Sequence, residues 1–248
     1  MKNINTILAV GAVAAVCGAA SGDVTTLYSQ NFNAMTTSST AALPTDWRFF
    51  NGSTPTWGGV TTSAVNLYAG TTGAGAATGS SGGGNYLWVD GVLTSGTDKA
   101  IGFLSSNSQA APRSIMFAYT NNTGYGLSSF TASWDYEKYR SGSRAFNWTF
   151  FASTDGTNWS ALGDGDQSYS ADANNTTVSN PASSISKSAT FSASVANGTT
   201  LYLRWTYTGV GGSSNAQGLG IDNFSLVPAP GAAALIGLAG LITTRRRK

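Results

Sequence analysis

Apolar and polar residues alternate along several stretches of this chain. Between residues 130 and 137, Phe, Ala, Trp and Tyr occupy every second position, with Thr, Ser, Asp and Glu between them. Successive side chains of a β-strand point to opposite faces, so this period of two predicts a strand that is buried on one face. The same alternation predicts strands at residues 146–153, 191–195 and 201–207.

Other short apolar segments predict further strands, at residues 27–32, 86–89, 100–104, 114–119 and 220–227. Turn-forming pairs such as Asp155-Gly156 and Asn197-Gly198 separate the strands, and the body shows no apolar stripe of period 3.6. Residues 69–84 and 164–181 are rich in small and polar residues, which indicates long loops. The pattern predicts an all-β protein with a jelly-roll-like antiparallel β-sandwich.

The first 22 residues have the organisation of a secretory signal peptide. Lys2 supplies a positive charge, residues 7–16 are apolar, and small residues follow through Gly22. We therefore expect residues 1–22 to form a signal helix that is removed on export, together with Cys17, the one cysteine of the chain. A buried N-terminal helix and a lipoprotein signal at Cys17 are the alternatives.

The C-terminal segment, residues 227–248, combines three features. It opens with Val227, Pro228, Ala229, Pro230 and Gly231, continues with an apolar stretch to residue 242, and ends with Arg245, Arg246, Arg247 and Lys248. A helix over residues 231–242 would span about 18 Å, and one over residues 227–244 about 27 Å, against a hydrocarbon core of about 30 Å. The segment thus predicts a short, marginal transmembrane helix whose terminal cations stay in the cytoplasm.

This tail resembles the PEP-CTERM sorting signal of Gram-negative bacteria, in which a Pro-x-Pro motif, a short apolar helix and an Arg cluster follow one another. Ala229 stands where that family usually has Glu, as in its Val-Pro-Ala-Pro variant. The resemblance implies processing by an exosortase, which is a membrane cysteine protease, and association with exopolysaccharide. A plain tail anchor in the inner membrane is the alternative.

Composition excludes several functions. The chain has no His, and its mature part has no Cys, so Ser-His-Asp and Cys-His catalysis and conventional zinc sites are excluded. Five of the 13 basic residues lie in the two ends, which leaves eight against 11 acidic residues and a net charge of −3 in between. Nucleic acid is therefore not an expected partner.

The body also resembles a known group of domains. Residues 28–33, followed by Leu43-Pro44-Thr45-Asp46-Trp47, are similar to the opening of jelly-roll domains in secreted bacterial proteins, and residues 221–226 to their closing strand. The resemblance implies an adhesin-like or carbohydrate-binding sandwich over residues 23–226. It also implies a structural Ca²⁺ with Asp222 as a ligand. Asp164 and Asp166, together in a Gly-flanked loop, are further candidates, because Ca²⁺ takes six to eight oxygen ligands. The alternative is that Asp222 satisfies a turn or neighbouring backbone and that the two loop acids are solvated. No other cofactor is expected.

Carbohydrate binding requires exposed aromatic rings that stack on sugar faces. Trp57, Trp159 and Tyr169 fall near turns, and Tyr139 lies opposite the apolar face of its strand, so these four residues are the candidates. Packing at the ends of the sandwich is the alternative for each ring.

Glycoside hydrolysis needs only two carboxylates, and Asp135 and Glu137 lie about 7 Å apart on one strand face. A salt bridge on a polar sheet face explains Glu137 better. We therefore assign no catalytic residue and expect no enzyme. We expect a protein of the cell surface or extracellular matrix, structural or adhesive in role, with a carbohydrate-binding module as the alternative and a glycosidase as the third choice.

Overall fold

The computed structural model describes residues 25–37, 41–59, 61–62, 67–68, 83–89, 97–105, 112–172, 183–211 and 216–229. The expected signal peptide and the tail from Pro230 onward lie outside these ranges. The helical structure in these ranges is one 3-10 turn, η2 (Gly163–Gly165). No helix among the described residues has the length and apolar character needed to cross a bilayer.

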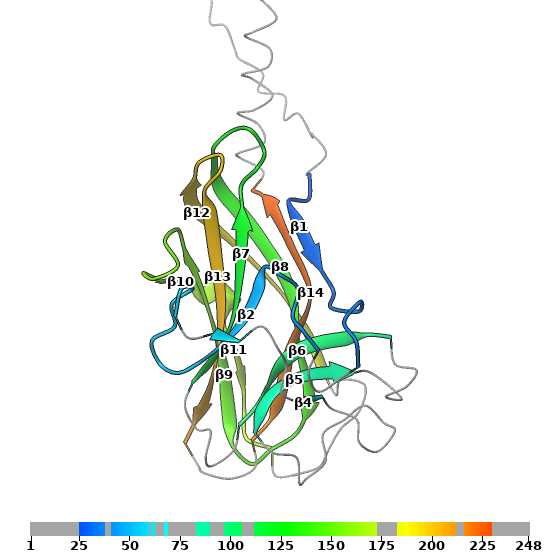
Figure 1. Cartoon of the computed structure of the whole chain (residues 1–248). Coiled ribbons are helices and arrows are strands. Elements are labelled where there is room, and N and C mark those ends of the chain that lie inside the picture. The colour runs from blue at the N-terminus through cyan, green and yellow to red at the C-terminus, as the bar shows by residue number, and fades with distance from the viewer. Residues whose placement is uncertain are drawn as a thin grey trace, which may run out of the picture.

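Two seven-stranded sheets form the body (Figure 1). The first has the order β12-β8-β14-β6-β5-β4, and β1 also pairs with β14. Its strands are β1 (Tyr28–Gln30), β4 (Leu67–Tyr68), β5 (Gly84–Val89), β6 (Lys99–Leu104), β8 (Leu127–Arg140), β12 (Ser183–Val195) and β14 (Gly218–Pro228).

The second sheet has the order β10-β9-β13-β7-β2-β3, with β11 pairing with β9. Its strands are β2 (Trp47–Asn51), β3 (Thr61–Thr62), β7 (Arg113–Thr120), β9 (Ala145–Ser153), β10 (Ser160–Ala161), β11 (Gln167–Tyr169) and β13 (Thr200–Val210). All described pairings are antiparallel except that of β4 with β5. The predicted all-β sandwich is confirmed.

The core between the sheets is rich in aromatic rings. Trp134 of β8 and Trp205 of β13 are buried, and their ring centroids lie 5.4 Å apart in a T-shaped arrangement. Phe150 of β9 packs on both of them, at 4.5 and 5.2 Å. Burying each such side chain contributes about 1.5–3 kcal/mol. The apolar positions of the alternating segments therefore point inward, as predicted.

Several strands are longer than expected or were not expected at all. β2 begins at Trp47, outside every predicted strand, and β11 lies inside the segment expected to be a loop. β12 begins at Ser183, because residues 183–190 pair in register with β8 although most of their side chains are polar. Strand pairing decides these elements, and local composition does not show it.

β14 extends past Leu226, where the body was expected to end. Val227 pairs with Thr131 and Pro228 with Phe130, and the Ala229 N–H donates to the Ser129 carbonyl at 3.0 Å. Pro is tolerated at a strand end because the ladder does not need its missing N–H. The first three residues of the Val-Pro-Ala-Pro motif are thus attached to the sheet.

Candidate functional site

Two short strands share one edge of β14, end to end (Figure 1). β1 pairs with residues 224–226 of β14 and β6 with residues 219–221, while β8 pairs along the opposite edge. Asp222 and Asn223 lie in the gap between β1 and β6, where the register against β8 also shifts. Asn223 has a φ of 50°, as expected at an irregularity that redirects side chains.

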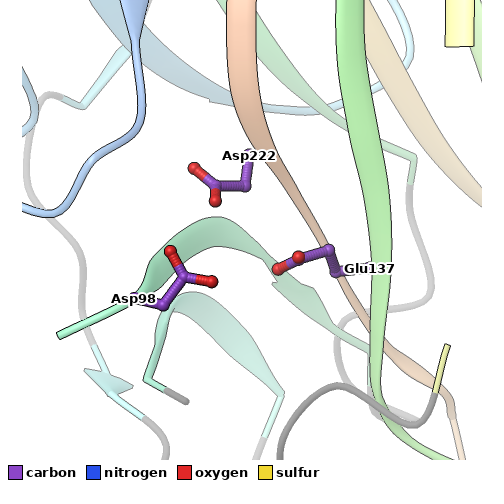
Figure 2. A group of neighbouring side chains, drawn as sticks. All are labelled: Asp98, Glu137 and Asp222. Atoms are coloured by element: carbon purple, nitrogen blue, oxygen red, sulfur yellow. The ribbon is translucent and has the colours of Figure 1, made fainter. Parts of the chain in front are cut away.

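Asp222 lies beside two other carboxylates, Asp98 and Glu137, and we call these three residues the acidic cluster (Figure 2). One carboxylate oxygen from each lies within 4.8 Å of the others. Asp98 directly precedes β6, Glu137 belongs to β8 and Asp222 to β14. Asp222 is 0% exposed and Glu137 is 4% exposed, so the cluster brings negative charge into the interior.

Two of the three carboxylates accept hydrogen bonds. The Tyr139 hydroxyl donates to Glu137 at 2.5 Å, and Asn33 Nδ2 donates to Asp98 Oδ1 at 3.2 Å. Neither oxygen of Asp222 accepts a hydrogen bond of good geometry from the described residues, although the Asn223 backbone N–H lies close enough to act on its charge. A buried carboxylate without donors is costly, so Asp222 is a group that a bound cation would satisfy.

Electrostatics at the acidic cluster follow from burial and from like charges. Burial raises the pKa of Asp222 to about 8, and the carboxylates of Glu137, Asp98 and Asp135 add to the rise, which the Asn223 backbone N–H only partly opposes. Burial and the charge of Glu137 also raise the pKa of the Tyr139 hydroxyl. Three carboxylates and no sulfur or imidazole form a donor set that suits Ca²⁺ rather than zinc.

Of the three expected calcium ligands, only Asp222 lies in the acidic cluster. The structure does not bring Asp164 or Asp166 to it: Asp164 is exposed in η2, and Asp166 accepts the Phe150 N–H at 2.8 Å. Sequence reasoning missed Asp98, which belongs to no motif. A salt bridge with a neighbouring cation was expected for Glu137. Only the pairing of β8 with β14 brings Glu137 close to Asp222, and the local sequence does not show this pairing.

Two of the expected stacking residues, Trp57 and Trp159, lie against the outer face of the second sheet, Trp57 beside Tyr202 and Trp159 beside Arg204. The Trp57 N–H donates to the Gly156 carbonyl and Trp159 Nε1 donates to the Pro55 carbonyl, both at 2.8 Å. The Tyr202 ring lies 5.4 Å from that of Trp57. All three residues are partly exposed.

Two arginines pack against the same rings. Arg204 lies 3.8 Å from the Phe151 ring centroid and 4.7 Å from that of Trp159. Arg48 lies 4.3 Å over the Trp57 ring and donates to the Trp57 carbonyl at 3.0 Å. We call the whole surface the aromatic platform; its members are Arg48, Trp57, Phe151, Trp159, Tyr202 and Arg204.

The other two expected stacking residues are buried, so the prediction that their rings are exposed is wrong. Tyr139 is 0% exposed and stacks on Trp88 at 5.2 Å and 6°, while Tyr169 is 7% exposed. The Trp88 indole packs directly on Gly218. A Cβ at residue 218 would lie 2.5 Å from the indole, so any larger residue would displace the ring. The outer face of the first sheet thus carries a covered layer that the alternation alone does not reveal.

Asp135 and Glu137, the pair considered for glycoside hydrolysis, have different surroundings. Asp135 accepts hydrogen bonds from the Ser186 hydroxyl at 2.5 Å and from Asn223 Nδ2 at 3.0 Å. Glu137 is buried in the acidic cluster instead. A glycosidase needs both carboxyl groups at the sugar, and a buried Glu137 does not meet this requirement.

The fold and these two sites define a class: a two-sheet β-sandwich with a buried acidic cluster and a surface platform of aromatic rings. No family model matches the chain. No curated protein matches its sequence.

Solved structures of similar architecture include an adhesin domain and a carbohydrate-binding domain. The K3 adhesin domain of Lys-gingipain from Porphyromonas gingivalis is 10% identical, covers 82% of this chain and 99% of its own, and has a TM-score of 0.43. The CBM22-1 xylan-binding domain of Xyn10C from Paenibacillus barcinonensis is 8% identical, covers 84% and 98%, and has a TM-score of 0.42. At these values, neither likeness carries an argument about ligand or activity.

Proposed function

We propose that this protein is an exported, non-catalytic β-sandwich with a structural or adhesive role at the cell surface or in an extracellular polysaccharide matrix, and that it binds polysaccharide on the aromatic platform. The observation that carries the proposal is the convergence of Trp57, Trp159 and Tyr202 on one accessible face. Rings with apolar faces and polar neighbours stack on sugars.

The rings of the platform are held before any ligand arrives. The Trp159 indole is held by its hydrogen bond to the Pro55 carbonyl, and the Trp57 ring packs against Arg48 and Tyr202. The backbone N–H of Trp57 also donates to the Gly156 carbonyl, which ties the loop after β2 to the turn after β9. Asp155 rigidifies that turn by accepting the N–H groups of Thr157 and Asn158 at 2.8 and 2.7 Å. Binding to a preorganised surface loses little conformational entropy, which favours affinity.

We propose that the two ends of the chain direct the protein to the cell envelope. The leader, residues 1–22, directs export, and the PEP-CTERM-like tail holds the body at the outer side of the inner membrane until an exosortase-type enzyme processes it. The terminal cations, residues 245–248, provide the stop. Exopolysaccharide is the proposed partner in the matrix.

We also propose a structural Ca²⁺ in the acidic cluster, held by Asp98, Glu137 and Asp222. Its support is the pair of buried Asp222 oxygens without hydrogen-bond partners in the described part of the chain. When bound, the ion compensates three carboxylates and connects β14 and β8 to the start of β6. Its role is stability, because the cluster is buried away from the platform's sheet.

The test is retention of the protein by polysaccharides in affinity gel electrophoresis, with thermal unfolding as the check on folding. Trp57→Ala and Trp159→Ala are each expected to raise the dissociation constant about 5-fold or more, if a sugar ring stacks as strongly as a nucleic-acid base, at about 1–3 kcal/mol per ring. Tyr125→Ala removes a 41% exposed ring elsewhere and is the matched control. Unchanged retention of both tryptophan variants, or equal loss in the control, would refute the platform as the binding surface.

A further inference from the structure

Arg204 is a buried cation without a described counter-anion. The side chain is 7% exposed, and its guanidinium lies between the Phe151 and Trp159 rings. Its Nε has no hydrogen-bond acceptor in the described part of the chain, and no carboxylate there forms an ion pair with it. Charged groups removed from water are normally paired, so Arg204 is a donor in need of an acceptor.

The charge of Arg204 persists at neutral pH. Burial lowers the pKa of its guanidinium to about 10, and no carboxylate offsets this decrease. Stacking on aromatic rings compensates part of the lost hydration, since the face of a ring attracts cations. Ring faces cannot accept the in-plane hydrogen bonds of a guanidinium, so the rings leave its N–H donors unsatisfied.

Arg48 places a second positive charge on the same surface. Arg48 and Arg204 both pair in register with Met116 of β7, from its two sides, so their Cα atoms lie two strand spacings apart, about 10 Å. Asp155, the acid of the adjoining turn, is occupied by its own loop, where it accepts hydrogen bonds from Ser153 and Asn158. Asp155 keeps its negative charge, so the two guanidinium groups of the platform outnumber the one carboxylate of the adjoining turn.

We propose that the aromatic platform binds an acidic polysaccharide, whose sugar rings stack on the aromatic residues while a carboxylate accepts hydrogen bonds from Arg204 and Arg48. This inference rests on the proposed function and adds the class of ligand. A guanidinium donates two parallel N–H bonds, and a carboxylate accepts them with its two oxygens. A hydroxyl group has a single oxygen and cannot accept both in this way. A neutral sugar leaves Arg204 unpaired, so the platform discriminates in favour of uronic acids.

The experiment is isothermal titration of the full chain with trigalacturonate, with its methyl ester, which has the same rings without charge, and with a short polyglutamate, which has the charge without rings. Trigalacturonate is expected to bind at least 10-fold more tightly than the ester, with an affinity that falls as salt rises. Arg204→Met is expected to reduce the preference for trigalacturonate over its ester to less than 2-fold. Lys187→Met, on β12 of the other sheet, is the matched control and is expected to change nothing.

Each other outcome has a distinct meaning. Equal affinity for acid and ester overturns the acidic ligand and leaves polysaccharide binding standing. Equal affinity for polyglutamate shows a general anion surface, of the kind an acidic protein would use, and also overturns the inference. Binding to no sugar, acidic or neutral, overturns both proposals. If Arg204→Met fails to fold, Arg48→Met, at a partly exposed side chain, must still lower the preference for acid or the inference fails.

Discussion

The substitution Asp222→Asn removes one negative charge from the acidic cluster and hardly changes the size of the side chain. We expect the proposed Ca²⁺, at about 100 times its dissociation constant, to stabilise the native fold by about 2.7 kcal/mol. For a domain of about 200 residues, this raises the melting temperature by roughly 5–10 °C. The Asn variant loses a charged ligand, so we expect it to lose most of this gain.

Without the cation, we expect the Asp222→Asn variant to be more stable than the native protein. The carboxyl of Asp222 has an ordinary pKa near 3.8 in the unfolded chain, and burial raises its folded pKa to about 8. Because the folded pKa is raised, the stability contributed by the protonated group is complete below about pH 4 and is lost as pH rises through 8. At about 1.4 kcal/mol per pH unit, burying the charged form costs up to about 5 kcal/mol at pH 8. Asparagine avoids this cost.

The assay is thermal and urea unfolding, followed by tryptophan fluorescence, at pH 4, 6 and 8 with 1 mM Ca²⁺ or with EDTA. Asp222→Asn should be more stable than the native protein in EDTA at pH 8, similar to it near pH 4, and less stable in Ca²⁺ at pH 8. Asp164→Asn, outside the cluster, is the control and should respond to Ca²⁺ like the native protein. A native protein indifferent to Ca²⁺, or an Asn variant destabilised equally in both buffers, would show that the reasoning is wrong.

Two further predictions concern the fold and the tail. Gly102→Ala would place a Cβ 1.9 Å from the Leu219 carbonyl oxygen, so we expect a loss of more than about 3 kcal/mol in urea unfolding; Gly126→Ala, whose Cβ would meet only the Val195 carbonyl at 4.0 Å, is the control. If the Gly102→Ala protein has the same urea midpoint as the native protein, the close approach of β6 to β14 at residue 102 is wrong. Replacing residues 245–248 with serine removes the cations that stop translocation, so the membrane-bound fraction should fall in cell fractionation, and an unchanged fraction would count against the sorting argument.

Much of the sandwich could be predicted because the buried face of a strand shows in the local sequence, as apolar residues at every second position. The alternation predicts that the apolar side chains of residues 130–136 and 201–207 face the core, and Tyr136 and Tyr207 at their ends are indeed buried. The covered outer face of the first sheet was not predicted. Tyr139 and Glu137 occupy polar-looking positions of β8, and their burial depends on neighbours from β5 and β14.

The strand-rich fold and the inward faces of its strands follow from the local pattern of residues, and the lack of histidine is plain from composition. Which side chains come together depends on the packing of distant strands. Asp98, Glu137 and Asp222 lie far apart along the chain and converge where β1 and β6 leave a gap beside β14. Trp159 reaches the loop that carries Trp57 through its hydrogen bond to Pro55. Register and pairing between distant strands are long-range properties, and no local pattern of residues specifies them.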